Sequence, residues 1–323
     1  LTLSFQVRLE DEVQAADENE NNGEPVDPVE VAFQDITGFL FDDSSIDASV
    51  MLTRVAWSKT DVEQQPVDYA GTYTALFPGF QNKENGPVGT GHAVITVSTN
   101  QGKVKVAGVA SDYHKIKGST YLARTGVIPY FSTMYPVKRQ NQAGRMITET
   151  RGFQLGFLYL EKQEETTFVD GLTVWLNKGW TNNIYSNGFH AFAVNGQVWV
   201  HDKQNPGATL GGMGFAELTF LEGDLGSGFS NTWRVDQDKS TFKAVKFQKP
   251  DVYEYVNGVK ASVSLKTGVF KGTFIHPESQ EKVKYIGAIL QGEQAGEGTF
   301  MGPTEGGKVI LNAGSEPVSP SSE

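Results

Sequence analysis

Two of the five histidines have a spacing that could bind a divalent metal ion. The pair Asn195-Gly196 separates two alternating segments, FHAFAV and QVWVHD, and Asn-Gly in this setting is the strongest short signal for a two-residue hairpin. In that hairpin His190 lies opposite His201 with the β-carbons about 4.5–5.5 Å apart, so both imidazoles could share an ion if another strand supplied further ligands. The same face carries aromatic side chains, however. The pattern therefore favours an aromatic ladder with structural histidines over a metal site.

The segment DENENNGEPVDP carries oxygen ligands at alternate positions, as a calcium loop does: Asp17, Asn19 and Asn21. An extra asparagine moves Gly23 away from the position at which an EF-hand loop makes its sharp turn. We therefore interpret this segment as an acidic spacer that repels itself and stays extended.

Two aromatic residues provide a third candidate site. In NKGWTNNIYSNGF, Trp180 and Tyr185 lie among asparagines, where an exposed pair of rings could stack against a sugar. Most tryptophans are largely buried, so the glycan platform is the alternative to a structural role.

No catalytic signature accompanies these candidates. Two turns hold acid–base side chains, DYH at 112–114 and HPE at 276–278, but neither has a serine or cysteine nucleophile at a recognisable elbow. A glycosidase needs two carboxylates about 5–9.5 Å apart, and the 38 acidic residues offer many such pairs without singling one out. We therefore expect a protein that is not an enzyme and has no cofactor.

The composition indicates a chain built from strands. Thirty-six glycines, 20 phenylalanines and 11 tyrosines, with five methionines and no cysteine, are typical of short strands joined by tight turns. Alternating segments recur through residues 31–311, and no window shows a helical stripe. We predict an all-β fold in which an antiparallel meander forms a barrel-like or sandwich body.

Two further hairpins are predicted in this body. AVITVST and KVKVAGV flank a turn at residues 100–102, in which Gly102 takes the left-handed position, and SVSL and VFKGTF flank a turn at residues 266–268. Both second strands contain an internal glycine, Gly108 or Gly272. This shared rhythm is consistent with two repeat-related halves divided near 185–215, although one large body fits the length equally well.

The first ten residues, LTLSFQVRLE, predict an isolated extension strand. Its apolar side chains alternate with polar ones and would face one way: Leu1, Leu3, Phe5, Val7 and Leu9. A lone strand is not stable in water, so this one must join a sheet of its own body, of a preceding domain or of a neighbouring subunit. Its position before a long spacer favours the neighbour, because strands of one compact domain are usually joined by short loops.

The charge of the chain is concentrated near its beginning. The net charge is −11, yet residues 11–30 hold eight acidic and no basic side chains, and subtracting these leaves −3 for the remainder. We expect this segment to be a flexible linker, and residues 312–323 to be a disordered tail. No basic stripe suggests nucleic acid as a partner, and no apolar run approaches the ~20 residues of a membrane-spanning helix.

Several segments together resemble a known kind of module. SLKTGVFKGTF, KVKYIGAILQGEQAGEGTFMGP and GTYTALFPG, within residues 66–311, are similar to glycine-punctuated β-meander, barrel-like modules of large secreted or surface proteins of bacteria. The resemblance implies export to the cell surface or beyond, and it supplies no active site. We therefore predict a non-catalytic structural or adhesion subunit that assembles with neighbouring proteins by strand addition, with a glycan-binding module as the alternative.

Overall fold

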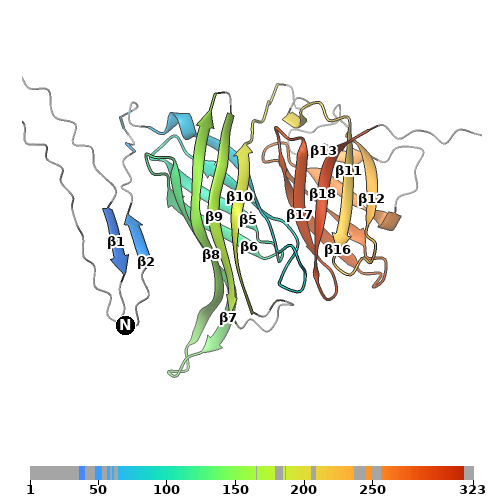
Figure 1. Ribbon diagram of the computed structural model, residues 1–323, viewed down its shortest axis with the longest axis horizontal. Helices are drawn as coiled ribbons and strands as arrows, with labels where there is room; N and C mark the ends of the chain where they lie inside the picture. Colours follow the sequence, from blue (N-terminus) through green and yellow to red (C-terminus); the bar gives the residue numbers. More distant parts are fainter. Residues whose placement is uncertain are drawn as a thin grey trace, which may run out of the picture. The chain divides into compact units, whose positions relative to one another are not determined.

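The computed structural model describes residues 36–40, 48–52, 57–58, 60–61, 65–164, 166–178, 185, 187–204, 209–235, 245–248 and 256–315. The chain divides into two compact units, residues 1–56 and 57–323, and each is described by itself. The described elements are antiparallel strands (Figure 1), with short 3₁₀ turns at Val67–Tyr69 and Val256–Gly258. The predicted all-β fold is confirmed.

The described residues of the first unit form a pair of strands. Strands β1 (Ile36–Leu40) and β2 (Ala48–Leu52) pair in antiparallel register, with Gly38 opposite Val50.

The second unit begins with an open, curved sheet of eight strands, which we call the half-barrel. Its strands are β3 (Gly71–Phe77), β4 (Gly91–Val97), β5 (Lys103–Val109), β6 (Lys115–Tyr121), β7 (Val127–Gln140), β8 (Met146–Gln163), β9 (Thr166–Lys178) and β10 (Asn187–Val198). The order β6-β5-β4-β3-β10-β9-β8-β7 joins two four-stranded meanders through β3 and β10. As a result, β6 and β7 follow each other in the chain but form the two edges of the sheet.

A closed barrel of eight strands follows. Its strands are β11 (Phe215–Glu222), β12 (Phe229–Val235), β13 (Val245–Gln248), β14 (Lys260–Val263), β15 (Val269–Ile275), β16 (Lys282–Leu290), β17 (Ala295–Met301) and β18 (Gly306–Gly314). Pairing of β11 with β18 closes the barrel, so it has no free edge. Its interior is filled by aromatic rings, among them Phe220, Phe274 and Tyr285.

Two of the predicted hairpins are confirmed. Strand β4 pairs with β5 and β14 with β15, and Gly102 has the predicted left-handed conformation with φ of 60°. Gly268 at the other turn is also left-handed, with φ of 67°. Gly108 and Gly272, the internal glycines of the second strands, are required for the same structural reason. A β-carbon on Gly108 would lie 1.8 Å from the His92 carbonyl oxygen, and one on Gly272 would lie 1.7 Å from that of Lys260, so both positions exclude a side chain.

The predicted hairpin at Asn195-Gly196 is wrong. Strand β10 runs straight through both residues, and it is paired with β9 on one edge and β3 on the other. Gly196 serves close strand packing instead of a turn, because a β-carbon there would lie 2.4 Å from the Thr74 carbonyl oxygen. Two ladders therefore override the local turn signal.

The barrel covers the outer face of β3 and β4. The Thr74 hydroxyl donates to the Ile289 carbonyl oxygen at 3.0 Å, and the Thr299 hydroxyl donates to that of Ser111 at 2.7 Å. Leu76 packs with Ala288 and Leu290 in a small apolar cluster between the two sheets. The junction also reaches the end of β10, where Gln197 accepts a hydrogen bond from the Gly292 amide at 3.1 Å, and it leaves side chains of β5–β9 exposed.

Candidate protein-interaction surface

The outer surface of β7–β10 carries apolar side chains on three successive rungs that cross all four strands. We call these twelve positions the apolar face: Phe131, Leu155, Val174 and Ala191; Pro129, Phe157, Leu172 and Ala193; Thr133, Phe153, Leu176 and Phe189. Directly paired residues of an antiparallel sheet point to the same side, so each rung is continuous from β7 to β10. Eleven of the twelve positions are apolar and none is charged.

Several of these side chains are well exposed. Phe131 is 56 %, Leu172 59 % and Phe189 62 % exposed, and the Phe131 and Phe153 rings lie 6.2 Å apart. Single exposed apolar residues are common on soluble proteins, but a contiguous group usually marks a binding surface. The arrangement is therefore a candidate binding surface.

One border of the apolar face is the line where β6 and β7 approach each other, which we call the seam. No ladder joins these two strands within the described sheet. The Lys117 amide instead donates to the Ser132 hydroxyl at 3.0 Å. The facing edges therefore hold backbone groups that no strand ladder uses.

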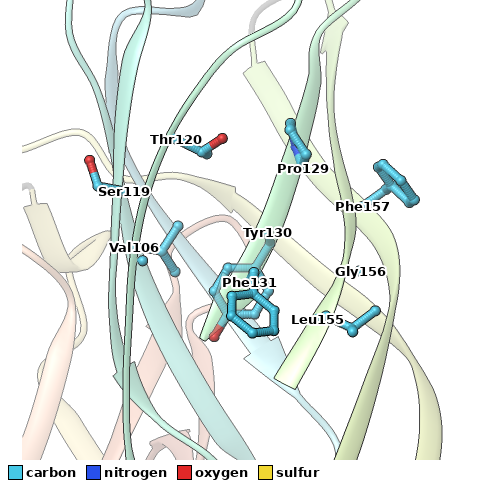
Figure 2. A pocket seen from close by; sticks show the side chains of 10 residues that line it. Val106, Ser119, Thr120, Pro129, Tyr130, Phe131, Leu155, Gly156 and Phe157 are labelled. Atoms are coloured by element: carbon cyan, nitrogen blue, oxygen red, sulfur yellow. The ribbon is translucent and has the colours of Figure 1, made fainter. Parts of the chain in front are cut away.

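A cavity of about 360 Å³ opens at the seam (Figure 2). Tyr130 and Phe131 of β7 line one side, and Ser119 and Thr120 of β6 lie across from them. Gly118 contributes no side chain to fill the space beside the Tyr130 ring. The cavity connects the apolar face with the interior of the half-barrel, because Val106, a buried core residue, also lines it.

Across the seam, the outer faces of β5 and β6 carry four exposed lysines, which we call the lysine strip: Lys103, Lys105, Lys115 and Lys117. Neither strand contains an acidic residue. Within the described part of the chain, none of the four forms an ion pair. The seam therefore separates an apolar surface from a cationic one.

A buried polar network lies at the turn between β5 and β6. Asp112 accepts hydrogen bonds from the Tyr135 hydroxyl and the His114 amide, and its carboxylate lies 3.1 Å from His114 Nδ1. The Trp175 indole donates to the Tyr135 oxygen at 2.6 Å. Burial and the neighbouring carboxylate raise the pKa of Tyr135, so its hydroxyl stays a neutral donor. Asp112 is almost fully buried, which suits a structural link between the turn and β7 better than contact with a substrate.

A second cavity, of about 580 Å³, lies beside β14–β16 of the barrel. Lys260, Lys271 and Lys284 line it together with the buried Tyr285. Tyr285 is fixed by its hydroxyl, which donates to the Lys260 carbonyl oxygen at 2.8 Å. The lining offers positive charge and the hydroxyl groups of Ser262 and Thr273, and it contains no carboxylate.

The structure separates the two histidines that the sequence placed opposite each other. His190 pairs with Trp175 and stacks on Phe80 with ring centroids 4.1 Å apart. His201 follows β10 and lies 3.5 Å from the Thr209 hydroxyl. Among the described residues, no three histidine, aspartate or glutamate side chains come together as a metal site requires.

The other candidates have mixed outcomes. Tyr185 is half-buried and accepts a hydrogen bond from the Gly306 amide at 2.7 Å, which ties it to the barrel. Trp180 lies outside the described residues, as do Asp17, Asn19, Asn21 and the opening strand with Leu1, Leu3, Phe5, Val7 and Leu9. No described feature supports a glycan platform.

Sequence reasoning missed the apolar face, although the sequence contains a signal for it. The segment FQLGFLYL in β8 has apolar residues at both odd and even positions, as a strand buried on both faces does. In the structure only one face is buried, because Gln154, Leu158 and Leu160 point inward while Leu155 and Phe157 are exposed. A contiguous apolar group on one exposed face of a strand is typical of a binding surface.

Comparison of the chain with family models, curated proteins and solved structures finds no match in any of the three. No helix among the described residues is long and apolar enough to cross a membrane.

Proposed function

We propose that this protein is a non-catalytic structural or adhesion subunit, located outside the cell or at its surface, that assembles with neighbouring copies of itself. The apolar face is the observation that carries this proposal. Its three uncharged rungs span four strands, a pattern typical of a surface that is buried in an assembly. The location follows from the resemblance to secreted and surface modules.

The copies assemble by strand addition. In this mode an extended segment adds to a sheet edge, where main-chain hydrogen bonds supply affinity and alternate side chains supply specificity. The opening segment LTLSFQVRLE has the required alternation. The half-barrel has two strand edges at the seam, whereas the barrel is closed.

Sedimentation velocity of the intact chain tests the proposal. We expect the wild-type protein to associate as its concentration rises, and the double variant Phe157→Asp with Leu172→Asp to stay monomeric at concentrations at least ten times higher. These two residues are cross-strand partners on the apolar face, and charging both opposes burial of that face.

A matched double variant, Val67→Asp with Ile275→Asp, controls for the added charge. Both residues are exposed apolar side chains outside the apolar face. We expect this control to associate as the wild type does. A wild-type protein that is monomeric throughout, or equal loss of association in both double variants, would contradict the proposal.

A further inference from the structure

We infer that the acceptor for assembly is the seam, and that its occupant is the opening segment of a second copy of this chain, residues 1–30. The alternating strand, residues 1–10, adds to the edges of β6 and β7, and the acidic segment that follows it lies along the lysine strip. This inference rests on the proposed function and deepens it by naming the acceptor and the donor.

The backbone along the seam offers unladdered strand edges to an added strand. In the half-barrel the seam is where two strand edges face each other without a ladder, and a hydrogen bond from a backbone amide to a serine side chain crosses it instead. An added strand would satisfy the amide and carbonyl groups along both edges. Widening the seam requires the loss of the Lys117–Ser132 hydrogen bond and, at the turn that joins β6 to β7, of the hydrogen bond from the Ala123 amide to the Val127 carbonyl oxygen. The new ladder replaces them.

The side chains at the seam match those of the opening strand in polarity. On the inner side of the sheet the cavity at the seam is lined by the buried Val106 and Tyr130, so it offers an apolar lining to the inward face of an added strand. The opening strand presents five apolar side chains on one face. Its other face is polar, with Thr2, Ser4, Gln6, Arg8 and Glu10, and would point to solvent.

The charge of residues 11–30 is opposite to that of the lysine strip. Residues 11–30 hold eight acidic and no basic side chains, and they follow the strand without a break. The lysine strip borders the seam and has no acidic residue on its own strands. When residues 1–10 occupy the seam, the acidic residues 11–30 therefore lie next to four lysines. Association should weaken as salt screens these charges.

Disulfide trapping in the intact chain tests the inference, because the protein has no cysteine of its own. One preparation carries Gln6→Cys on the polar face of the opening strand, and a second carries Ser119→Cys on β6. Each chain then has one thiol, so a disulfide between the two preparations joins two copies. Ser4→Cys and Arg8→Cys repeat the test at neighbouring registers.

The matched control acceptor is Ser230→Cys, an exposed serine on β12 of the barrel. We expect at least one donor position to cross-link to Ser119→Cys ten times faster than to Ser230→Cys in mixed, oxidised samples. Lys105→Glu with Lys117→Glu in the acceptor chain should slow trapping at least five-fold.

Three outcomes would overturn the inference. These are equal trapping rates at Ser119→Cys and Ser230→Cys, trapping unchanged by the lysine substitutions, and rapid closure within one chain of a dilute Gln6→Cys, Ser119→Cys double variant. If the wild type associates in sedimentation but trapping fails, the acceptor is wrong and the proposed function stands. If the wild type does not associate, the proposed function itself fails.

Discussion

Tyr135 has a left-handed backbone, with φ of 53°, in the middle of a strand, and its ring is buried. Such a conformation is costly for a residue other than glycine, so its surroundings must stabilise it. The hydroxyl group provides the reason, since it donates to the buried Asp112 carboxylate and accepts from the Trp175 indole. This local geometry could not be predicted from the sequence, because the three residues are far apart in the chain.

Removing this hydroxyl should destabilise the protein. Tyr135→Phe leaves the buried Asp112 carboxylate with one donor fewer and the Trp175 N–H without its acceptor, and we expect a loss of about 2 kcal/mol in the free energy of unfolding. Urea denaturation measures it. The control is Tyr159→Phe, the same change at an exposed position of β8, for which the expected effect is below about 0.5 kcal/mol. Equal effects of both substitutions would show that the network is not stabilising.

His92 gives a second test at the scale of one residue. It is paired with Leu76 on the face of the half-barrel that the barrel covers, and burial lowers its pKa from 6.5 to about 4. The unfolded chain therefore binds a proton between pH 6.5 and about 4 that the folded protein does not. Above pH 6.5 the histidine is neutral in both the folded and the unfolded state and does not change the free energy of unfolding. As the pH falls toward 4, protonation of the unfolded chain lowers the free energy of unfolding by about 3 kcal/mol.

His92→Gln removes that titration. We expect the free energy of unfolding of the variant to fall less steeply between pH 7 and pH 4 than that of the wild type, whatever its absolute value. Parallel pH profiles for the two proteins would mean that His92 is protonated equally in the folded and unfolded states.

At the scale of the element, local patterns predicted strands well and one turn badly. Alternation and turn residues are local signals, so they located the hairpins at Gly102 and Gly268. At Asn195 the same kind of signal failed because the strand lies between two others, and ladders along both edges outweigh a preference for one turn. Which strands become neighbours depends on the whole sheet, and the sequence of one segment does not contain that information.

Two valine substitutions distinguish a strand from a turn. Asn195 is exposed on β10, where a β-branched residue is favourable, so Asn195→Val should change the free energy of unfolding by less than about 0.5 kcal/mol. Gln101 has a φ of 63° in a true turn, and Gln101→Val should cost about 1–2 kcal/mol in the same urea experiment. If Asn195→Val lowered the free energy of unfolding as much as Gln101→Val, this would favour a turn at Asn195 and contradict the continuous strand.

At the scale of the whole molecule, the barrel decides which parts of the half-barrel are left uncovered. It covers β3 and β4, while the lysine strip and the apolar face are exposed on either side of the seam. The sequence predicted a β body and an assembly strand, but the acceptor surface could not be predicted. It is formed by four strands whose outward side chains only the sheet order brings together.

Hydrogen–deuterium exchange of the intact protein, compared between a dilute and a concentrated sample, tests the assembly surface most directly. We predict that concentration slows amide exchange in peptides from β6–β10, most strongly along β6 and β7, because their free edges gain hydrogen bonds and the apolar face becomes buried. Peptides from β11–β18 of the closed barrel should exchange equally in both samples. Protection confined to the barrel strands, or no concentration dependence anywhere, would contradict assembly through the half-barrel.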